Sequence, residues 1–453
     1  MRVAIITLGC DKNTVDSEYL AGLLEEAGHP VFPFDKERPF DVLVINTCGF
    51  IDIAKEESIN VILSWAEEKK RRQRAGLPSF RLLVVGCLAE RYARELGDSI
   101  QEIDALVGVG RWKEVVKFIE SPPGMSKTKL STSLPRQTPR IKILRPMPRR
   151  KLDDLPYAFL KIADGCSHRC SFCAIPLIKG SYRSVPRKIL LTEAQELIKS
   201  GIREINLVAQ DINRYGKDLY KRYDLVRLVR DIAAIPGKFW IRLLYFYPQS
   251  LPQRMVHLIK EEPKLCPYID IPLQHLSPDI LRRMGRPAKP GRILHILGEW
   301  REQIPDLTIR TTFIVGFPGE TRGDFSQLLA GVREFGFDRL GAFLYSSEEG
   351  TRAGGWRPVP TRTARRRLER LMEIQENISF RKNQAKVERI SEVLVEQGFP
   401  DQGLYIARSR ADAPEVDGAV IIHSDRLLNP GEFVRVRITE AQTYDLIGHP
   451  VGP

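Results

Sequence analysis

The segment Cys166-Ser167-His168-Arg169-Cys170-Ser171-Phe172-Cys173 carries three cysteines in a C-x3-C-x2-C spacing. Three thiolates on one tight loop can bind three irons of a four-iron, four-sulfur cube. The fourth iron then has no ligand from the protein and stays open to another molecule. The spacing therefore predicts an iron–sulfur cluster with one free coordination position, held by Cys166, Cys170 and Cys173.

A structural zinc site is the alternative for this loop. Such sites usually pair a C-x2-C unit with a second pair or with distant histidines. The chain has no second pair, and His168 lies inside a loop too short to wrap one ion with all four groups. We therefore expect iron. An open iron can chelate S-adenosylmethionine (SAM) and reduce its sulfonium, and the cleavage that follows yields a 5′-deoxyadenosyl radical.

The chain around this loop alternates strands and helices. Strands are expected at 158–162, 204–208, 240–244, 268–271, 308–314 and 339–343. Six such units favour a partial or complete barrel of parallel strands, which places its active site at the carboxyl ends of the strands. The cysteine loop follows the first of these strands. A long basic helix at about 363–387 is expected to close the region.

Three further cysteines each follow an apolar run in the N-terminal part. Cys10, Cys48 and Cys87 lie 38 and 39 residues apart, which is one βαβ repeat each. Strands are expected at 3–8, 41–45 and 81–85, with helices at 16–27 and 55–70. Successive parallel strands end at the same edge of a sheet, so we expect the three thiols to converge there as a second cluster site. The alternative is that each is a small buried hydrophobic residue, as we expect for Cys266.

Bulk composition describes an ordinary folded chain. The 453 residues suggest two to four domains, 43% are hydrophobic, and the formal charge is +13. This charge makes an anionic or ribosome-like environment a natural partner class. No apolar run reaches the roughly 18–20 residues of a membrane span. A cytoplasmic location is therefore expected, and in a reducing cytosol the seven cysteines are interpreted as ligands or catalytic groups before disulfides.

Several blocks of the chain resemble the radical-SAM methylthiotransferase family, and the branch that acts on a ribosomal protein in particular. These blocks are Gly9 to Glu18, Asn46 to Ile59, Asp164 to Gly180, Gln210 to Tyr220, Ile271 to His275, Gly316 to Thr321, and Asp412 to Gly418. The sequence departs from this pattern at Asp11, where proline is usual, and at Glu90 and Ala407. No departure removes a cysteine.

The resemblance implies an α/β architecture in three parts. These are an N-terminal parallel-sheet cluster domain, a radical-SAM (β/α) partial TIM-like barrel, and a small C-terminal all-β TRAM barrel. Together with composition it predicts domains at 1–120, 154–388 and 389–453. Residues 121–153 form a linker, since Ser121 to Lys151 holds six prolines, nine Lys or Arg and no acid. We interpret this linker as a solvated tether.

The resemblance also implies an enzyme that replaces C–H by C–S–CH3. One SAM gives the methyl group and another the radical, and the Cys10, Cys48 and Cys87 cluster handles sulfur. Cofactors are then two four-iron clusters and SAM. The expected substrate is an aspartate of ribosomal protein S twelve, with flavodoxin or ferredoxin as reductant and no membrane. A tRNA adenosine is the alternative substrate. An RNA-binding or electron-carrier protein with a vestigial barrel is the non-enzymatic alternative.

Candidate SAM contacts lie at the exits of the expected barrel strands. Gln210 and Gln274 could hydrogen-bond SAM, although a structural amide is an equal alternative. Gly316 would let the backbone approach a ligand closely, although such a glycine is more often part of a turn.

The C-terminal part differs from the rest in charge. Residues 391–453 hold ten acids and five arginines, a net charge of −5. A domain that grips tRNA should be basic instead. We therefore predict that Asp412, Glu415 and Asp417 form a docking patch for a basic protein, the alternative being that they only solvate a loop.

Overall fold

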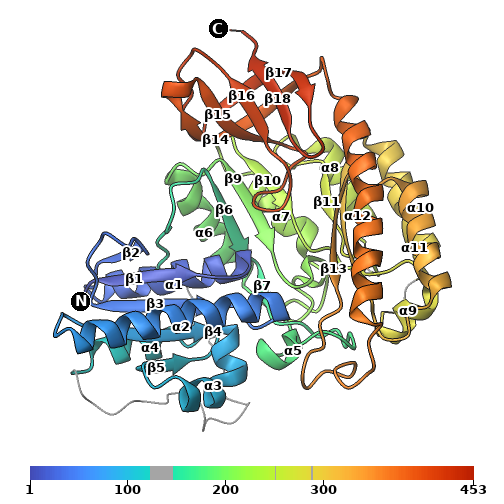
Figure 1. Ribbon diagram of the computed structural model, residues 1–453. Coiled ribbons are helices and arrows are strands. Elements are labelled where there is room, and N and C mark those ends of the chain that lie inside the picture. The colour runs from blue at the N-terminus through green and yellow to red at the C-terminus, as the bar shows by residue number, and fades with distance from the viewer. Residues whose placement is uncertain (123–145, 250, 287–288, 453) are drawn as a thin grey trace.

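The computed structural model describes residues 1–122, 146–249, 251–286 and 289–452. Three bodies pack together in it (Figure 1): an N-terminal α/β domain in blue, a central array of strands and helices, and a small β-barrel in red at the C-terminal end. No helix in these ranges is both long and apolar enough to cross a membrane. The expected α/β class with a C-terminal all-β barrel is confirmed.

The N-terminal domain is a parallel sheet of strand order β2-β1-β3-β4-β5. Its strands are β1 (Val3–Thr7), β2 (Val31–Pro33), β3 (Val42–Thr47), β4 (Arg81–Gly86) and β5 (Ala105–Val107). Its helices are α1 (Asp11–Glu26), α2 (Asp52–Arg74), α3 (Cys87–Ser99) and α4 (Trp112–Glu120). The central strands are apolar along their whole length because helices cover both faces of a parallel sheet.

Helix α1 begins earlier than its apolar periodicity predicts. Position 16 is the expected start, but Cys10 is the N-cap and the helix begins at Asp11. The first turn is polar yet buried, because Asp11 and Lys12 contact Tyr245 of the central array and Asn13 binds the strand ends of its own sheet. Because these residues are polar, the apolar periodicity did not predict that they form the first turn of the helix.

Six parallel strands form the central array, as expected. They are β6 (Tyr157–Lys161), β9 (Glu204–Val208), β10 (Trp240–Leu243), β11 (Tyr268–Asp270), β12 (Thr308–Val315) and β13 (Arg339–Leu344). They form two sheets, β10-β9-β6 and β11-β12-β13, and Ile241 of β10 makes a parallel bridge with Leu265, just before β11. Strands β6 and β13 are the outer edges, so the array is a partial barrel with one open side.

Helices and short strands connect this array. The helices are α5 (Ile175–Ile178), α6 (Arg187–Lys199), α7 (Leu225–Ala233), α8 (Gln253–Glu261), α9 (Pro278–Arg283), α10 (Pro290–Gln303), α11 (Arg322–Phe335) and α12 (Thr361–Gln384). The short elements are β7 (Ala163–Asp164), β8 (Arg183–Ser184) and the 3-10 turn η1 (Ile212–Arg214). Helix α12 is the predicted long basic helix and packs against α11 and β13.

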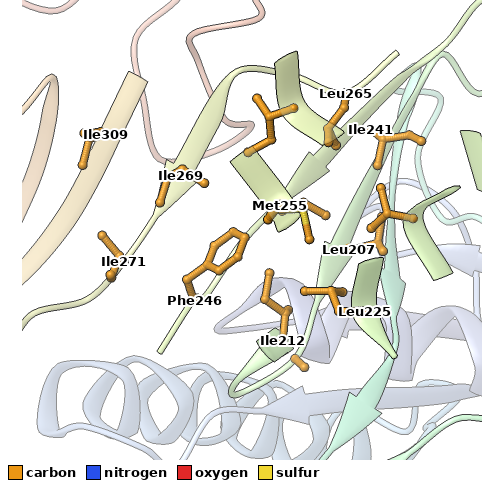
Figure 2. Close-up of a cluster of buried hydrophobic side chains, with 14 of the residues drawn as sticks. Leu207, Ile212, Leu225, Ile241, Phe246, Met255, Leu265, Ile269, Ile271 and Ile309 are labelled. Atoms are coloured by element: carbon orange, nitrogen blue, oxygen red, sulfur yellow. The ribbon is translucent and has the colours of Figure 1, made fainter. Parts of the chain in front are cut away.

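Residue alternation along the strands separates a dry face from a polar one. Ile241, Ile269 and Ile309 belong to one apolar cluster that also includes Leu225 of α7 and Met255 of α8 (Figure 2). Each such side chain contributes roughly 1.5–3 kcal/mol by leaving water. The neighbouring positions turn the other way: Asp270 is in register with Arg310, and both line the interior. The two-residue alternation of the strands thus places polar side chains in the interior and apolar side chains on the outer face, under the helices.

The C-terminal body is a closed barrel of strand order β14-β15-β16-β18-β17. Its elements are β14 (Ile390–Phe399), η2 (Pro400–Gln402), β15 (Leu404–Ser409), β16 (Val420–His423), β17 (Phe433–Ala441) and β18 (Leu446–Pro450). Its own core includes Val393, Tyr405 and Val436. The segment 410–419 between β15 and β16 leaves this barrel and reaches the central array.

The solvated-tether interpretation is wrong for the end of the 121–153 segment. Arg149 is buried, with its guanidinium paired to Glu18 of α1 and, at 2.7 Å, to Glu193 of α6. A Cβ on Gly22 would lie 2.4 Å from the carbonyl oxygen of Pro148, so α1 is shaped to receive this backbone. Two acids from different domains draw this arginine inward. Residues 123–145 lie outside the described ranges.

Candidate active site

Cys10, Cys48 and Cys87 lie at the carboxyl ends of three adjacent strands, as the βαβ spacing predicts. Cys48 directly follows β3, and Cys87 opens α3 directly after β4. Gly9 (φ 95°) carries no side chain, and a Cβ there would lie 2.6 Å from the Cβ of Cys48. The glycine before Cys10 therefore allows two of the cysteine-bearing loops to approach closely.

Asn13 ties these loops together. Its side-chain Nδ2 donates to the carbonyl oxygens of Leu8, at 2.9 Å, and Thr47, at 3.0 Å. Its Oδ1 lies 3.9 Å from the Sγ of Cys87. One buried amide thus contacts the ends of all three strands and fixes their relative positions.

A buried ion-pair network lies beside this edge. Lys179 is 1% exposed, and its Nζ lies 3.4 Å from Asp16 Oδ2 and 3.5 Å from Asp164 Oδ1. Lys161 binds the other oxygen of Asp16. Although burial opposes it, the charges of Asp164 and Asp16 hold the pKa of Lys179 well above its usual value. The network therefore keeps a fixed cation at the cysteine edge.

Backbone hydrogen bonds hold the Cys166–Cys173 loop in the central array. The Cys166 amide donates to Gly180 O at 3.0 Å, and the Ser171 amide to Met284 O at 2.8 Å. His168 stacks on Tyr247 with ring centroids 3.7 Å apart, and its Nε2 lies 2.7 Å from Asp211 Oδ2. These contacts arrange the loop without using a thiol.

Burial raises the pKa of the thiols. The pKa of Cys48 and that of Cys166 rise to about 11, and that of Cys173 to about 12. These three thiols are therefore protonated at neutral pH in the metal-free protein, and metal binding to them must release protons.

One cavity of about 550 Å³ joins both sets of cysteines. Its wall includes Cys10, Cys48, Cys87, Cys166, Cys170 and Cys173. A four-iron cube takes a thiolate at separate corners and so spreads its ligands more widely than a single ion does. Within the described ranges, no three His, Cys, Asp or Glu side chains are grouped to hold one metal ion. The thiol donor set fits two four-iron clusters.

The predicted SAM contacts do not all reach this cavity. Gln210 and Gln274 line it, and Gln274 adopts a left-handed backbone (φ 71°) with no described partner for its Oε1. Gly316 is not part of the wall. Its amide donates to Glu320 Oε2, and a Cβ on it would lie 2.6 Å from the Cβ of Ala364. The structure gives this glycine a packing role, since it makes room for α12, and a SAM contact at Gly316 stays a prediction.

Several lining residues were not predicted. Arg286 lies 4.8 Å from the ring centre of Tyr247 and donates to Pro272 O at 2.6 Å. Lys12 lies 3.1 Å from the ring centre of Tyr245, whose backbone is left-handed (φ 69°). The loops that bear Arg286, Tyr245 and Tyr247 have no distinctive spacing, so no sequence signal could have found them.

The predicted acidic docking patch is wrong for two of its three members. Asp412 is 2% exposed and binds Arg339 Nη2 at 2.5 Å, and Asp417 accepts from Tyr268 Oη at 2.5 Å. Both acids face the central array because buried partners of β11 and β13 neutralise or hydrogen-bond them. Glu415 alone stays exposed, and with Pro414 and Val416 it lines the cavity.

Comparison with known proteins identifies the family to which this chain belongs. Residues 2–108 match the Uncharacterized protein family UPF0004, residues 160–330 the Radical SAM superfamily, and residues 387–451 the TRAM domain. A relative from Thermoanaerobacter sp. (strain X514), named ribosomal protein uS12 methylthiotransferase RimO, is 43% identical over 98% of this chain and 99% of its own. The chain belongs to the RimO family. RimO relatives from Carboxydothermus hydrogenoformans (42%) and Geobacter sulfurreducens (41%) cover 99% of this chain and 99% and 98% of their own.

Solved structures agree on the fold. The radical SAM methyltransferase TsrM from Kitasatospora setae gives a TM-score of 0.55 over 78% of this chain and 77% of its own, at 14% identity. The cobalamin-dependent radical enzyme OxsB gives 0.52 over 83% and 56%, also at 14%. As a RimO-family radical SAM enzyme, the chain uses SAM and four-iron clusters as cofactors, in agreement with the thiols that line the cavity.

Proposed function

We propose that this enzyme methylthiolates an aspartate side chain of ribosomal protein uS12. One observation carries the proposal: six cysteines from two domains line a single cavity, which the C-terminal loop 414–416 also reaches. A sulfur-handling site and a SAM site must act on the same carbon, and one shared cavity allows this.

The two cysteine sets have separate roles in this proposal. Cys166, Cys170 and Cys173 hold the SAM-binding cluster, and Cys10, Cys48 and Cys87 hold the auxiliary cluster. When bound, the first cluster would supply the electron that cleaves SAM, and the second would supply sulfur. Gly9 allows the auxiliary loops to approach each other, and Asn13 holds them. Gln210 and Gln274 are proposed SAM contacts from the strand exits.

The cavity wall carries cationic side chains that can pair with carboxylates of the two substrates. SAM and the target aspartate both carry a carboxylate, and Lys12, Arg286 and Arg310 line the cavity. Arg310 and Lys12 already pair with Asp270 and Asp11. Arg286 has no carboxylate partner among the described residues, so it is the cation most open to a carboxylate ligand.

The proposed function implies an electron donor and a cellular location. A low-potential electron donor such as flavodoxin or ferredoxin would reduce the clusters, and the cytoplasm would supply both the donor and the ribosomal substrate. We propose functional units at 1–120, 154–388 and 389–453, with 121–153 between the first two.

Methylthiolation of a tRNA adenosine is not favoured. Relatives at 41–43% identity over nearly the whole chain are named for uS12. The net charge of −5 over residues 391–453 also disfavours a phosphate backbone on the C-terminal barrel.

The test uses the full chain, reconstituted anaerobically with iron and sulfide. It is incubated with SAM, dithionite and either recombinant uS12 or tRNA, and both products are analysed by mass spectrometry. We expect a methylthio group on one aspartate of uS12 and unmodified tRNA. Modified adenosine with unmodified uS12 would overturn the proposal.

A further inference from the structure

The loop between β15 and β16 is fastened to the central array at both ends. On one side Asp412 binds Arg339 of β13, and its backbone carbonyl accepts from Arg408 Nη1 at 2.8 Å. On the other side Asp417 binds Tyr268 of β11 and lies 3.4 Å from Arg310 Nε of β12. Four residues lie between these two acids. The contacts therefore project a short, constrained tip into the cavity.

Glu415 stands at this tip in a strained conformation. Its φ of 68° is left-handed, which a residue with a Cβ adopts only when its surroundings impose it. Its Oε1 accepts from Tyr157 Oη at 3.2 Å. The next residue, Val416, is 53% exposed, and Phe343 across the wall is 46% exposed. A carboxylate flanked by open apolar side chains suits a polypeptide better than a small polar molecule.

Glu415 differs from the other carboxylates of the wall. Asp11 pairs with Lys12, Asp270 with Arg310, and Glu348 with Arg91. Glu415 has no cationic partner among the described residues.

A second negative charge lies close to Glu415. Partial burial of the carboxylate group raises the pKa of Glu415, the hydrogen bond from Tyr157 lowers it, and the charge of Asp11 raises it. Asp11 Oδ2 is itself buried with no described hydrogen-bond partner, on a side chain 6% exposed. Asp11 pairs with Lys12 through its Oδ1, so Glu415 is the carboxylate at this end of the cavity that has no ion-pair partner among the described residues.

We propose that Glu415 binds a lysine or arginine that lies within a few residues of the target aspartate in the polypeptide substrate. This inference rests on the proposed function and names how the substrate is recognised. A residue of extended chain spans at most about 3.3–3.6 Å, so a neighbouring side chain can reach Glu415 while the aspartate occupies the cavity. The same carboxylate would repel nucleic-acid phosphate.

The test compares the full-length reconstituted enzyme with Glu415→Gln, which keeps the side-chain shape and removes the charge. Recombinant uS12 is the substrate, together with uS12 variants in which each Lys or Arg near the modified aspartate is changed to Gln. Asp401→Asn is the matched control, because it removes one exposed acid of the same C-terminal barrel. Iron content and 5′-deoxyadenosine release without uS12 are measured for each protein.

We expect Glu415→Gln to raise KM for uS12 about fivefold to tenfold, since the loss of a charge pair near solvent weakens binding by about that factor. Iron content, SAM cleavage without uS12 and the Asp401→Asn variant should be unchanged. One uS12 variant should show the same KM rise with the wild-type enzyme and no further rise with Glu415→Gln, because both changes remove one interaction.

Three results would overturn the inference. The first is an unchanged KM for uS12 in Glu415→Gln. The second is an equal rise in KM with every uS12 variant, and the third is a change in SAM cleavage by Glu415→Gln in the absence of uS12. The last would assign Glu415 to SAM instead. If wild-type enzyme fails to modify uS12 and modifies tRNA, the proposed function falls together with this inference, and that outcome is visible before any variant is made.

Discussion

Cys87 and Cys266 are both buried, and burial raises the pKa of both thiols. Their surroundings differ. Cys87 lines the cavity beside the ends of three strands, whereas Cys266 packs in an apolar cluster with Trp240 and Tyr268 and is absent from the cavity wall. At the scale of a residue, the cavity separates a candidate ligand from a structural thiol, while burial does not.

Replacement of Cys266 by serine tests this distinction. We expect Cys266→Ser to keep both clusters and most activity, and to lower stability by about 1–2 kcal/mol because a hydroxyl replaces a thiol in an apolar site. Iron analysis and a thermal unfolding curve measure both effects. Loss of a cluster from this variant alone would show that the ligand assignment is wrong.

Removal of the three thiols proposed to hold the SAM-binding cluster should give the complementary result. The wild-type chain should hold about eight irons when fully loaded, four per cube. The triple variant Cys166→Ala, Cys170→Ala, Cys173→Ala should hold about four and release no 5′-deoxyadenosine. An iron content of zero, or one that does not change, would contradict the assignment of two independent sites.

At the scale of an element, the loop 412–417 depends on buried charge pairs. Burial opposes ionisation of Asp412, but Arg339 and Lys386 hold its pKa below the usual value. A carboxylate whose pKa is lowered on folding stabilises the protein above its unfolded-state pKa, about 3.9, and loses that contribution as pH falls through the folded-state value.

Asp412→Asn should therefore loosen the C-terminal barrel. Loss of one partner of a buried pair costs about 3 kcal/mol. Hydrogen exchange of the β15 amides in the full chain should quicken accordingly at pH 7, and the difference from wild type should shrink below about pH 4. Glu440→Gln, which changes an exposed acid of β17, serves as the control and should alter exchange little. A difference from wild type that did not depend on pH would contradict the charge-pair explanation.

At the scale of the whole molecule, buried ions join the domains. Asp16 of α1 binds Lys161 of β6 and Lys179 after α5, and all three side chains are at most 5% exposed. Arg149 joins α1 to α6 in the same way. These pairs hold the N-terminal sheet against the open side of the partial barrel, so that both cysteine sets share a cavity.

Asp16→Asn should weaken this junction, because it leaves two buried ammonium groups with too little negative charge. We expect a loss of about 3–5 kcal/mol, seen as faster hydrogen exchange in α1 and β6 of the metal-free chain. The matched control is Asp41→Asn, which breaks the exposed pair with Arg2 and should cost less than about 1 kcal/mol. Equal effects of the two variants would show that the buried network does not hold the domains together.

The sequence by itself determined the fold class, the six barrel strands and the convergence of Cys10, Cys48 and Cys87. These features follow from local rules: an apolar strand period, helices of the right length, and the fact that parallel strands end at one edge of a sheet. A cysteine just after such a strand needs no further information to be placed.

Only the tertiary structure decided which charged residues are buried. Asp412 and Asp417 read as surface acids, and Arg149 as part of a solvated tether, because charged residues are mostly exposed. Their partners lie far away in the chain: Arg339 is 73 residues from Asp412, and Glu18 is 131 residues from Arg149. A buried charge is stable only when an opposite charge faces it, and no local pattern records that pairing. The fold alone thus left Glu415 exposed at the cavity.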